Sequence, residues 1–145
     1  MRIFIDSNIL ISAMLSKGTP FRAYQKAISN QNQGIICSQN IEEIRRIFNR
    51  KFPDRLHEME QFLALAVISL EIVPVPEIPM SQENEIRDIK DRSILRAAIQ
   101  AKADILLTGD KDFLESGILT PQVMTAAEFL AFQNSTLSHQ NTRTI

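Results

Sequence analysis

The arrangement of apolar segments along the chain constrains the fold more than any other feature. Five short, nearly continuous apolar runs alternate with longer stretches in which apolar residues recur at helical spacing. Continuous runs are typical of strands buried on both faces, as in a parallel sheet. We therefore predict an α/β fold in three layers, with helices covering both faces of a parallel sheet. The predicted strands are Arg2–Ile5, Gly34–Cys37, Leu70–Val73, Asp104–Leu107 and a weaker one near Gln122–Met124.

Helical spacing and turn residues predict six helices around these strands. The Phe52-Pro53 step separates two helices that should form a hairpin. Three prolines in Val73–Pro79 predict an extended connector, because proline cannot continue a helix. The predicted helices are Ile9–Leu15, Pro20–Ser29, Gln39–Arg50, Pro53–Ser69, Asp91–Lys102 and Thr125–Gln133.

The length of 145 residues suits one domain with a sizeable core. We predict a single domain over residues 1–133, followed by a polar, mobile tail over residues 134–145. No apolar stretch approaches the roughly 20 residues that a membrane-spanning helix needs, and no apolar leader precedes the first strand. We therefore expect a cytoplasmic protein. The one cysteine, Cys37, lies in an apolar run and is interpreted as a core side chain.

The net charge of the chain limits how it can contact nucleic acid. Proteins that hold nucleic acid by a basic surface alone usually have a clear excess of Lys and Arg, whereas this chain has a net charge of −1. Any contact with nucleic acid must therefore be local. Bound divalent cations would supply positive charge at such a site.

Four acidic residues are predicted to meet at one edge of the sheet. Asp6 directly follows the first strand, and Asp110 follows the fourth strand through Thr108-Gly109. Glu43 lies near the start of the helix after the second strand, and Asp91 is predicted to begin the helix that leads into the fourth. In open α/β sheets, ligands bind outside the carboxyl ends of the strands, where these acids would gather.

Several carboxylates in one cleft repel one another unless a cation neutralises them. Carboxylate oxygens favour Mg²⁺ or Mn²⁺, and the chain has no grouping of His and Cys that would favour zinc. Its two histidines, His57 and His139, are isolated in the sequence. The acids therefore predict a site for a hard divalent cation.

Each acid also has a purely structural interpretation. Asp6 and Asp110 could cap the helical segments that follow them. Glu43 could complete a capping box with Asn40 or pair with Arg46, and Asp91 stands where a helix favours an acid. Capping does not require the four residues to gather on one sheet edge, so their convergence favours the cation site.

The sequence resembles the PIN-domain ribonucleases, particularly the toxin components of prokaryotic toxin–antitoxin pairs. In the third motif Asp91 matches the acid and Asp88 is an accessory acid, followed by Ile89 where relatives often have proline. In the second motif Glu43 takes the place of the acid, with Glu42 beside it as its rival. The four matching motifs are Asp6–Leu10, Ser38–Ile44, Arg87–Leu95 and, most specifically, Ala103–Leu114.

This resemblance implies a four- or five-stranded parallel sheet in the order 3-2-1-4-5. It also implies Mg²⁺- or Mn²⁺-dependent cleavage of RNA. Proteins of this family often form dimers and are inhibited by an antitoxin, so the resemblance implies these properties too. A homodimer and a cognate antitoxin are therefore expected partners, beside the RNA substrate.

Our mechanistic hypothesis gives each acid a role in hydrolysis of an RNA phosphodiester. Asp6, Asp91 and Asp110 would ligate one or two Mg²⁺ ions, with Asp112 assisting. Glu43 would ligate a metal ion or orient the attacking water, and the products would carry a 5′-phosphate and a 3′-hydroxyl. Asn8 and Thr108 are candidates for hydrogen bonds that fix the carboxylates.

A basic stretch and two other activities complete the sequence-based hypotheses. Arg45, Arg46 and Arg50 could meet the RNA backbone, although a solvated helix face is the simpler interpretation. A small phosphohydrolase with Asp6 as nucleophile is an alternative, but Asp6-Ser7-Asn8 lacks a second aspartate. A metal-binding domain that serves only as an interaction module is the other alternative.

Overall fold

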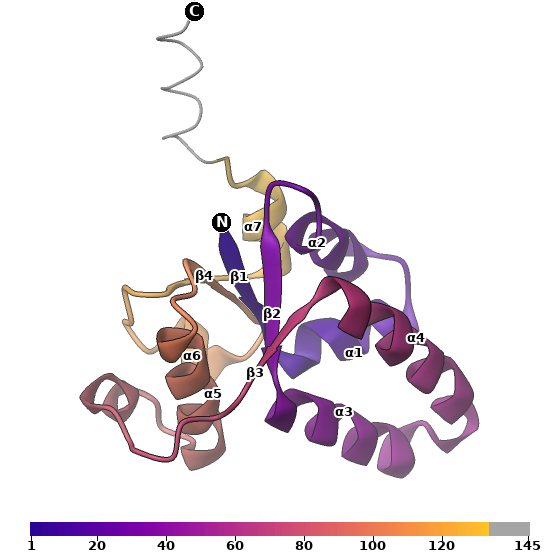
Figure 1. Cartoon of the computed structure of the whole chain (residues 1–145), viewed down its shortest axis with the longest axis horizontal. Coiled ribbons are helices and arrows are strands. Elements are labelled where there is room, and N and C mark those ends of the chain that lie inside the picture. Colours follow the sequence, from indigo (N-terminus) through magenta and orange to yellow (C-terminus); the bar gives the residue numbers. More distant parts are fainter. Residues whose placement is uncertain (134–145) are drawn as a thin grey trace, which may run out of the picture.

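A computed structural model of the chain describes residues 1–133, and Figure 1 shows its arrangement. Five strands form one sheet in the order β3-β2-β1-β4-β5, and every neighbouring pair is parallel. This order confirms the predicted three-layer α/β fold. The strands are β1 (Arg2–Ile5), β2 (Gln33–Cys37), β3 (Glu71–Val73), β4 (Ile105–Leu107) and β5 (Gln122–Met124).

The helices occupy the two faces of this sheet, with α5 and α6 on one side and α1 to α4 on the other (Figure 1). The α-helices are α1 (Ser7–Leu15), α2 (Thr19–Ala27), α3 (Ser38–Lys51), α4 (Leu56–Ser69), α5 (Ile89–Gln100), α6 (Lys111–Leu114) and α7 (Ala126–Ala131). Two 3-10 helices, η1 (Pro53–Arg55) and η2 (Ser81–Glu85), lie in the connections.

Alternation along the strands produces a core on each face. In β1, Ile3 and Ile5 pack with α1, α2, α3, α4 and α7, whereas Phe4 packs with α5 and α6. The three residues of β4 divide in the same way. All of these strand residues are fully buried, which explains why the strands have nearly continuous apolar sequences.

The pairing of the two central strands positions the acidic edge. Ile5 of β1 lies opposite Leu107 of β4, so both strands end at the same level. The next residues, Asp6 and Thr108, are therefore neighbours although about a hundred positions separate them. This juxtaposition is a direct consequence of parallel pairing at the centre of the sheet.

Several predicted boundaries are corrected by the structure. The helix expected to begin at Asp91 begins at Ile89 and is capped by Asp88, so Asp91 lies in its first turn. The helix expected over Pro53–Ser69 consists of η1 followed by α4. The predicted tail, residues 134–145, lies outside the described residues. Within residues 1–133, no helix is both long enough and apolar enough to cross a membrane.

Candidate metal centre

Asp6 is buried at the end of β1 and is held by three donors. Its Oδ1 accepts a hydrogen bond from the backbone N–H of Ser7 at 2.8 Å, which caps α1. Its Oδ2 accepts from the Thr108 hydroxyl at 2.7 Å and from Nδ2 of Asn8 at 3.2 Å. Asp6 therefore caps a helix and faces the acidic edge as well, so the two interpretations of this residue are compatible.

The Thr108-Gly109 link brings Asp110 to the same place. The backbone N–H of Asp110 donates to the Thr108 hydroxyl oxygen at 3.0 Å, and that of Gly109 donates to Oδ1 of Asn8 at 3.0 Å. Asp110 caps α6 by accepting from the N–H of Asp112. Asn8 and Thr108, predicted as supporting residues, thus connect the ends of β1 and β4.

Asp91 provides the most informative atom of the site. Its Oδ2 is buried and has no hydrogen-bond partner among the described residues. Burial raises the pKa of Asp91, and the adjacent carboxyl of Asp110 raises it further, with smaller contributions from Asp6 and Asp88. Buried polar atoms are rarely left without a partner, so this oxygen calls for a group that is not part of the chain.

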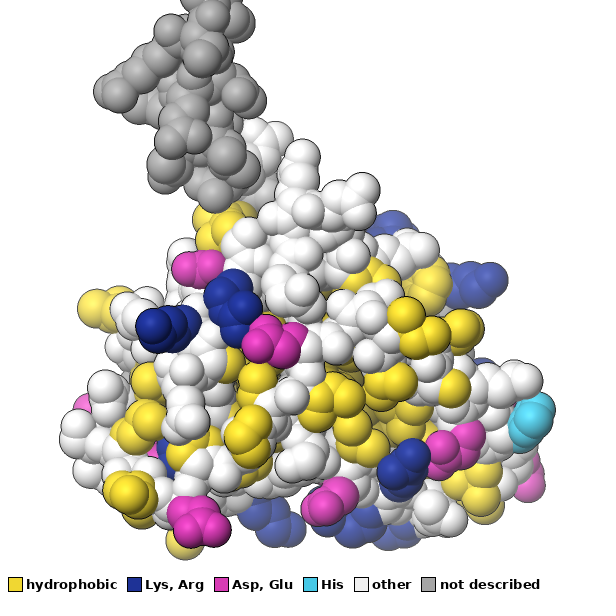
Figure 2. Space-filling model, viewed as in Figure 1, with side chains coloured by type: hydrophobic (Ala, Val, Ile, Leu, Met, Phe, Trp, Pro, Cys, Tyr) yellow, Lys and Arg dark blue, Asp and Glu magenta, His cyan; other side chains and the backbone are white. Residues whose placement is uncertain are grey.

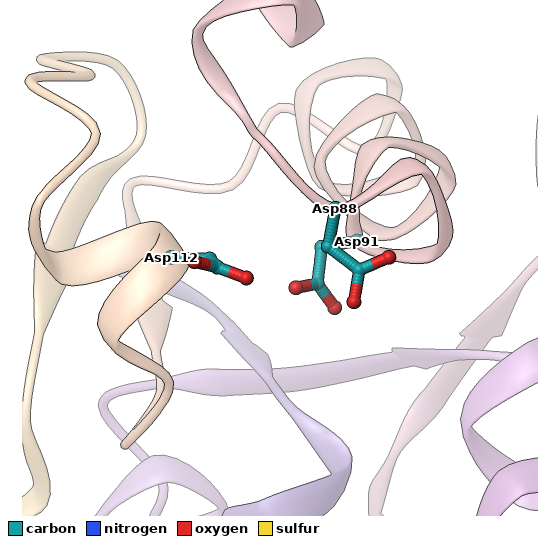
Figure 3. A group of neighbouring side chains, drawn as sticks. All are labelled: Asp88, Asp91 and Asp112. Carbon is teal, nitrogen blue, oxygen red and sulfur yellow. The ribbon is translucent and has the colours of Figure 1, made fainter.

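A fourth aspartate of this region, Asp88, lies closer to the other acids than its accessory place in the motif suggests. One carboxylate oxygen from each of Asp88, Asp91 and Asp112 lies within 4.8 Å of the others. Figure 3 shows Asp112 on α6 pointing across a gap towards Asp88 and Asp91 at the start of α5. Arg87 donates to Asp112 at 2.8 Å and offsets part of this negative charge.

Glu43 approaches the same edge from α3. It is half-buried, and burial raises the pKa of Glu43, with further contributions from Asp110 and Asp88. Arg46 and Lys90 act in the opposite direction and lower that pKa. Its neighbour Glu42 is exposed, so Glu43 is the glutamate that the structure places beside the aspartates.

A buried polar chain that the sequence analysis did not anticipate fixes α3 against α1. Nδ2 of Asn40 donates to the Ser7 hydroxyl at 2.9 Å, and Oδ1 of Asn40 accepts from the backbone N–H of Cys37. All three residues are fully buried. Asn40 therefore completes the capping box of α3 with Cys37, the part that one structural interpretation gave to Glu43.

The basic stretch of α3 divides between two surroundings. Arg45 forms a bidentate pair with Glu60 of α4, which favours the structural interpretation of this residue. Arg46 is exposed and close enough to Glu43 to affect its pKa. Arg50 is exposed near the end of the helix, as expected for a solvated helix face.

The electrostatics of the whole group suit a divalent cation. Burial raises the pKa of Asp6 to about 6, and the charges of Glu43 and Asp110 contribute to that rise. Carboxylates in mutual repulsion, together with the unpartnered oxygen of Asp91, form an oxygen-only donor set. Hard divalent cations prefer such donors, so the residues present fit a metal of this class.

Comparison with known proteins agrees with this arrangement. Residues 2–112 match the family model of the PIN domain, which includes the sheet edge and every acid described above. The chain belongs to the PIN domain family. Among curated proteins, none matches this PIN domain.

A solved structure has the same fold as this PIN domain. It is a chain of the crystal structure of VapBC2 from Rickettsia felis bound to a DNA fragment from their promoter. The two chains are 18% identical with a TM-score of 0.65, and the match covers 86% of this chain and 98% of the other. At this level of identity the likeness shows the fold alone.

Proposed function

We propose that this PIN domain is a Mg²⁺- or Mn²⁺-dependent endoribonuclease of the cytoplasm, and that it is the toxin of a toxin–antitoxin pair. The observation that carries the proposal is the buried, unpartnered Oδ2 of Asp91 inside a group of carboxylates at the carboxyl edge of the sheet. Structural carboxylates find donors within the protein, whereas this one faces other acids.

Asp6, Asp91 and Asp110 would hold the cation directly or through water, with Asp112 assisting. Asp88 would join them, because one of its carboxylate oxygens lies within 4.8 Å of those of Asp91 and Asp112. A bound divalent cation supplies charge neutralisation at the scissile phosphate and lowers the pKa of water. The hydroxyl of Thr108 and the amide of Asn8 keep the carboxylate of Asp6 in place.

Glu43 would act on the attacking water. Its raised pKa makes its carboxylate a better proton acceptor than an exposed glutamate. The carboxylate orients the water and takes its proton as the water oxygen attacks phosphorus. The bond from phosphorus to the 3′ oxygen then breaks, and the departing 3′ oxygen takes up a proton from solvent. This leaves a 3′-hydroxyl on one product and a 5′-phosphate on the other.

The test is cleavage of a panel of RNAs in Mg²⁺, in Mn²⁺ and in chelator. We expect cleavage with either metal and none in chelator. Asp6→Asn should lower the rate about 100-fold or more while preserving the fold, because it removes charge from the centre. Asp54→Asn is the matched control, since Asp54 is an exposed acid in η1.

Three outcomes would contradict this proposal. Full activity of the Asp6→Asn variant would remove the acids from the chemistry. RNA that stays intact under all conditions would favour an interaction module, and cleavage of a small phosphate ester instead would favour a phosphohydrolase.

The antitoxin is proposed on separate grounds. The solved neighbour is a VapBC2 complex, and the sequence motifs resemble those of toxin components. We expect the product of the gene adjacent to this one to bind the chain and inhibit its nuclease activity. Co-expression followed by the same cleavage assay tests this expectation, and undiminished cleavage by a complex of the two proteins would contradict it.

A further inference from the structure

A hollow adjoins the acidic edge, and none of the acids of the metal centre lines it. It has a volume of about 420 Å³ and lies between α1 and the first turns of α2 and α7. Asn8, Thr108 and Gly109 form its boundary with the acids, because the same residues hold Asp6 and Asp110 in place. Whatever occupies this hollow therefore lies directly beside the proposed cleavage site.

None of the residues that line the hollow has a formally charged side chain. Its walls combine apolar surface, from Ile9, Pro20 and Ala127, with the hydroxyls of Ser12, Thr19 and Thr125. The acids next to the hollow repel the phosphates of an RNA chain. Such a chain can lie close to the acids where the neighbouring wall is uncharged, as it is in this hollow. Apolar walls with a few hydroxyls suit the base and ribose of a nucleotide better than its phosphate.

The polar groups of the hollow differ in their availability. The Asn8 amide and the Thr108 hydroxyl are already bonded within the metal centre. The Ser12 hydroxyl has no hydrogen-bond partner in the described part of the chain and lines the hollow. This hydroxyl can therefore bond a group of the ligand without breaking an internal bond.

One cation, Arg22, lies at the α2 side of the hollow. The guanidinium of Arg22 donates to the Thr19 hydroxyl at 3.3 Å, which places a cation at the start of α2. No side chain caps the first turn of α2, whose N-cap residue is Gly18. A cation beside uncapped N–H groups would favour the phosphate that follows a nucleoside seated in the hollow.

We propose that this hollow is a subsite for single-stranded RNA, holding the base and ribose of a nucleotide next to the scissile phosphate. The proposal rests on the nuclease function proposed above and adds the place at which a nucleotide of the substrate lies beside the acids. A base seated in the hollow must be unstacked and unpaired, so the RNA is single-stranded at that position. The volume lies within the range of small-molecule sites, roughly 300–1,000 Å³.

The test fills the hollow without touching the acids. Ala127 is exposed on α7 and lines the hollow, so Ala127→Phe should block it while the fold is preserved. Ala131→Phe is the matched control, because Ala131 is exposed on the same helix and does not line the hollow. We expect kcat/KM for an RNA with one mapped cleavage site to fall about 10-fold in the first variant only.

A second measurement uses the unaltered protein. The nucleotides on either side of the cleavage site are replaced, one at a time, by an abasic ribose. Removal of the base at one of the two positions should lower kcat/KM about 10-fold for the unaltered protein and have no further effect in the Ala127→Phe variant. Equal rates for the abasic and complete RNAs at both positions, or equal losses in both phenylalanine variants, would overturn the subsite.

Binding separates this proposal from the nuclease function. If the unaltered protein cleaves no RNA, the affinities of the two phenylalanine variants for the same single-stranded oligonucleotide are compared in Mg²⁺ by fluorescence anisotropy. Weaker binding by Ala127→Phe than by Ala131→Phe supports the subsite even then. Equal affinities of the two variants for the oligonucleotide overturn the subsite. A variant that loses affinity for the proposed antitoxin, but loses no affinity for RNA, overturns it as well.

Discussion

Asp6 has two roles at the residue scale, and they place opposite demands on its charge. Its carboxylate caps α1, which favours ionisation, yet burial and the neighbouring acids raise the pKa of Asp6 from 3.8 to about 6. A group whose pKa is higher in the folded protein stabilises the fold while it is protonated. That stabilisation is present below about pH 4 and is lost as the pH rises through about 6.

This shift gives a prediction for the metal-free protein. In chelator, the free energy of unfolding of the unaltered chain should fall between pH 4 and pH 7 relative to that of Asp6→Asn. The difference should reach about 3 kcal/mol, from about 1.4 kcal/mol for each unit of pKa. Urea unfolding of both proteins at a series of pH values measures it. Parallel curves for the two proteins would show that Asp6 titrates in the folded state as it does in the unfolded chain.

Individual residues differ in how far the sequence predicts them. The acids could be found because each follows a recognisable strand or opens a recognisable helix. Asn40 could not, because its bond to Ser7 spans 33 positions and depends on the packing of two helices. The place of Asp88 beside Asp112 likewise depends on how the connector before α5 folds back.

At the scale of elements, the connector between β3 and α5 is fixed by hydrogen bonds to α5. Arg96 of α5 forms a bidentate pair with Glu83 of η2, at 2.7 and 2.8 Å, and also donates to the backbone carbonyl of Pro76. Both side chains of the pair are largely buried. These bonds hold the segment that leads to Asp88 against α5, so they position one wall of the metal centre.

Arg96→Met should therefore weaken the metal centre from a distance. We expect the affinity for Mn²⁺ to fall roughly 10- to 100-fold, the usual cost of losing groups that support metal ligands. Arg55→Met is the control, because Arg55 forms an exposed pair with Glu58 away from the site. Calorimetric titration of both variants measures the effect, and equal affinities would mean that the connector keeps its conformation without the buried pair.

The elements themselves were predicted well where apolar sequence alone defines them. All five strands lie within one residue of their predicted bounds, because apolar side chains mark each of them and the three central strands, β1, β2 and β4, are buried apolar runs. Helix α5 begins two residues before its predicted start. Asp88 caps it by accepting a hydrogen bond from the backbone N–H of Lys90, and apolar spacing does not reveal such a bond. The 3-10 helix η2 was missed because tertiary bonds from Arg96, rather than apolar periodicity, stabilise it.

At the scale of the whole molecule, one face has several exposed apolar side chains. Hydrophobic side chains gather on the face shown in Figure 2, over the region of α4 and β3. Leu65 and Ile68 on α4 are 71% and 80% exposed, and Ile72 on the edge strand β3 is 44% exposed. Contiguous exposed apolar surface of this kind often marks an interface between proteins.

We expect the isolated protein to form a homodimer through this surface, because symmetric dimers use one self-complementary patch. Replacing both Leu65 and Ile68 by Lys should shift the protein to monomer in sedimentation experiments, since it would bring four added positive charges into one interface. Ile78→Lys is the control, because Ile78 is 80% exposed but belongs to the connector after β3. A monomeric unaltered protein would refute the homodimer, and a dimer that survives the double substitution would place its interface elsewhere. Because the acidic edge lies outside this patch, the monomeric variant should retain its affinity for Mn²⁺.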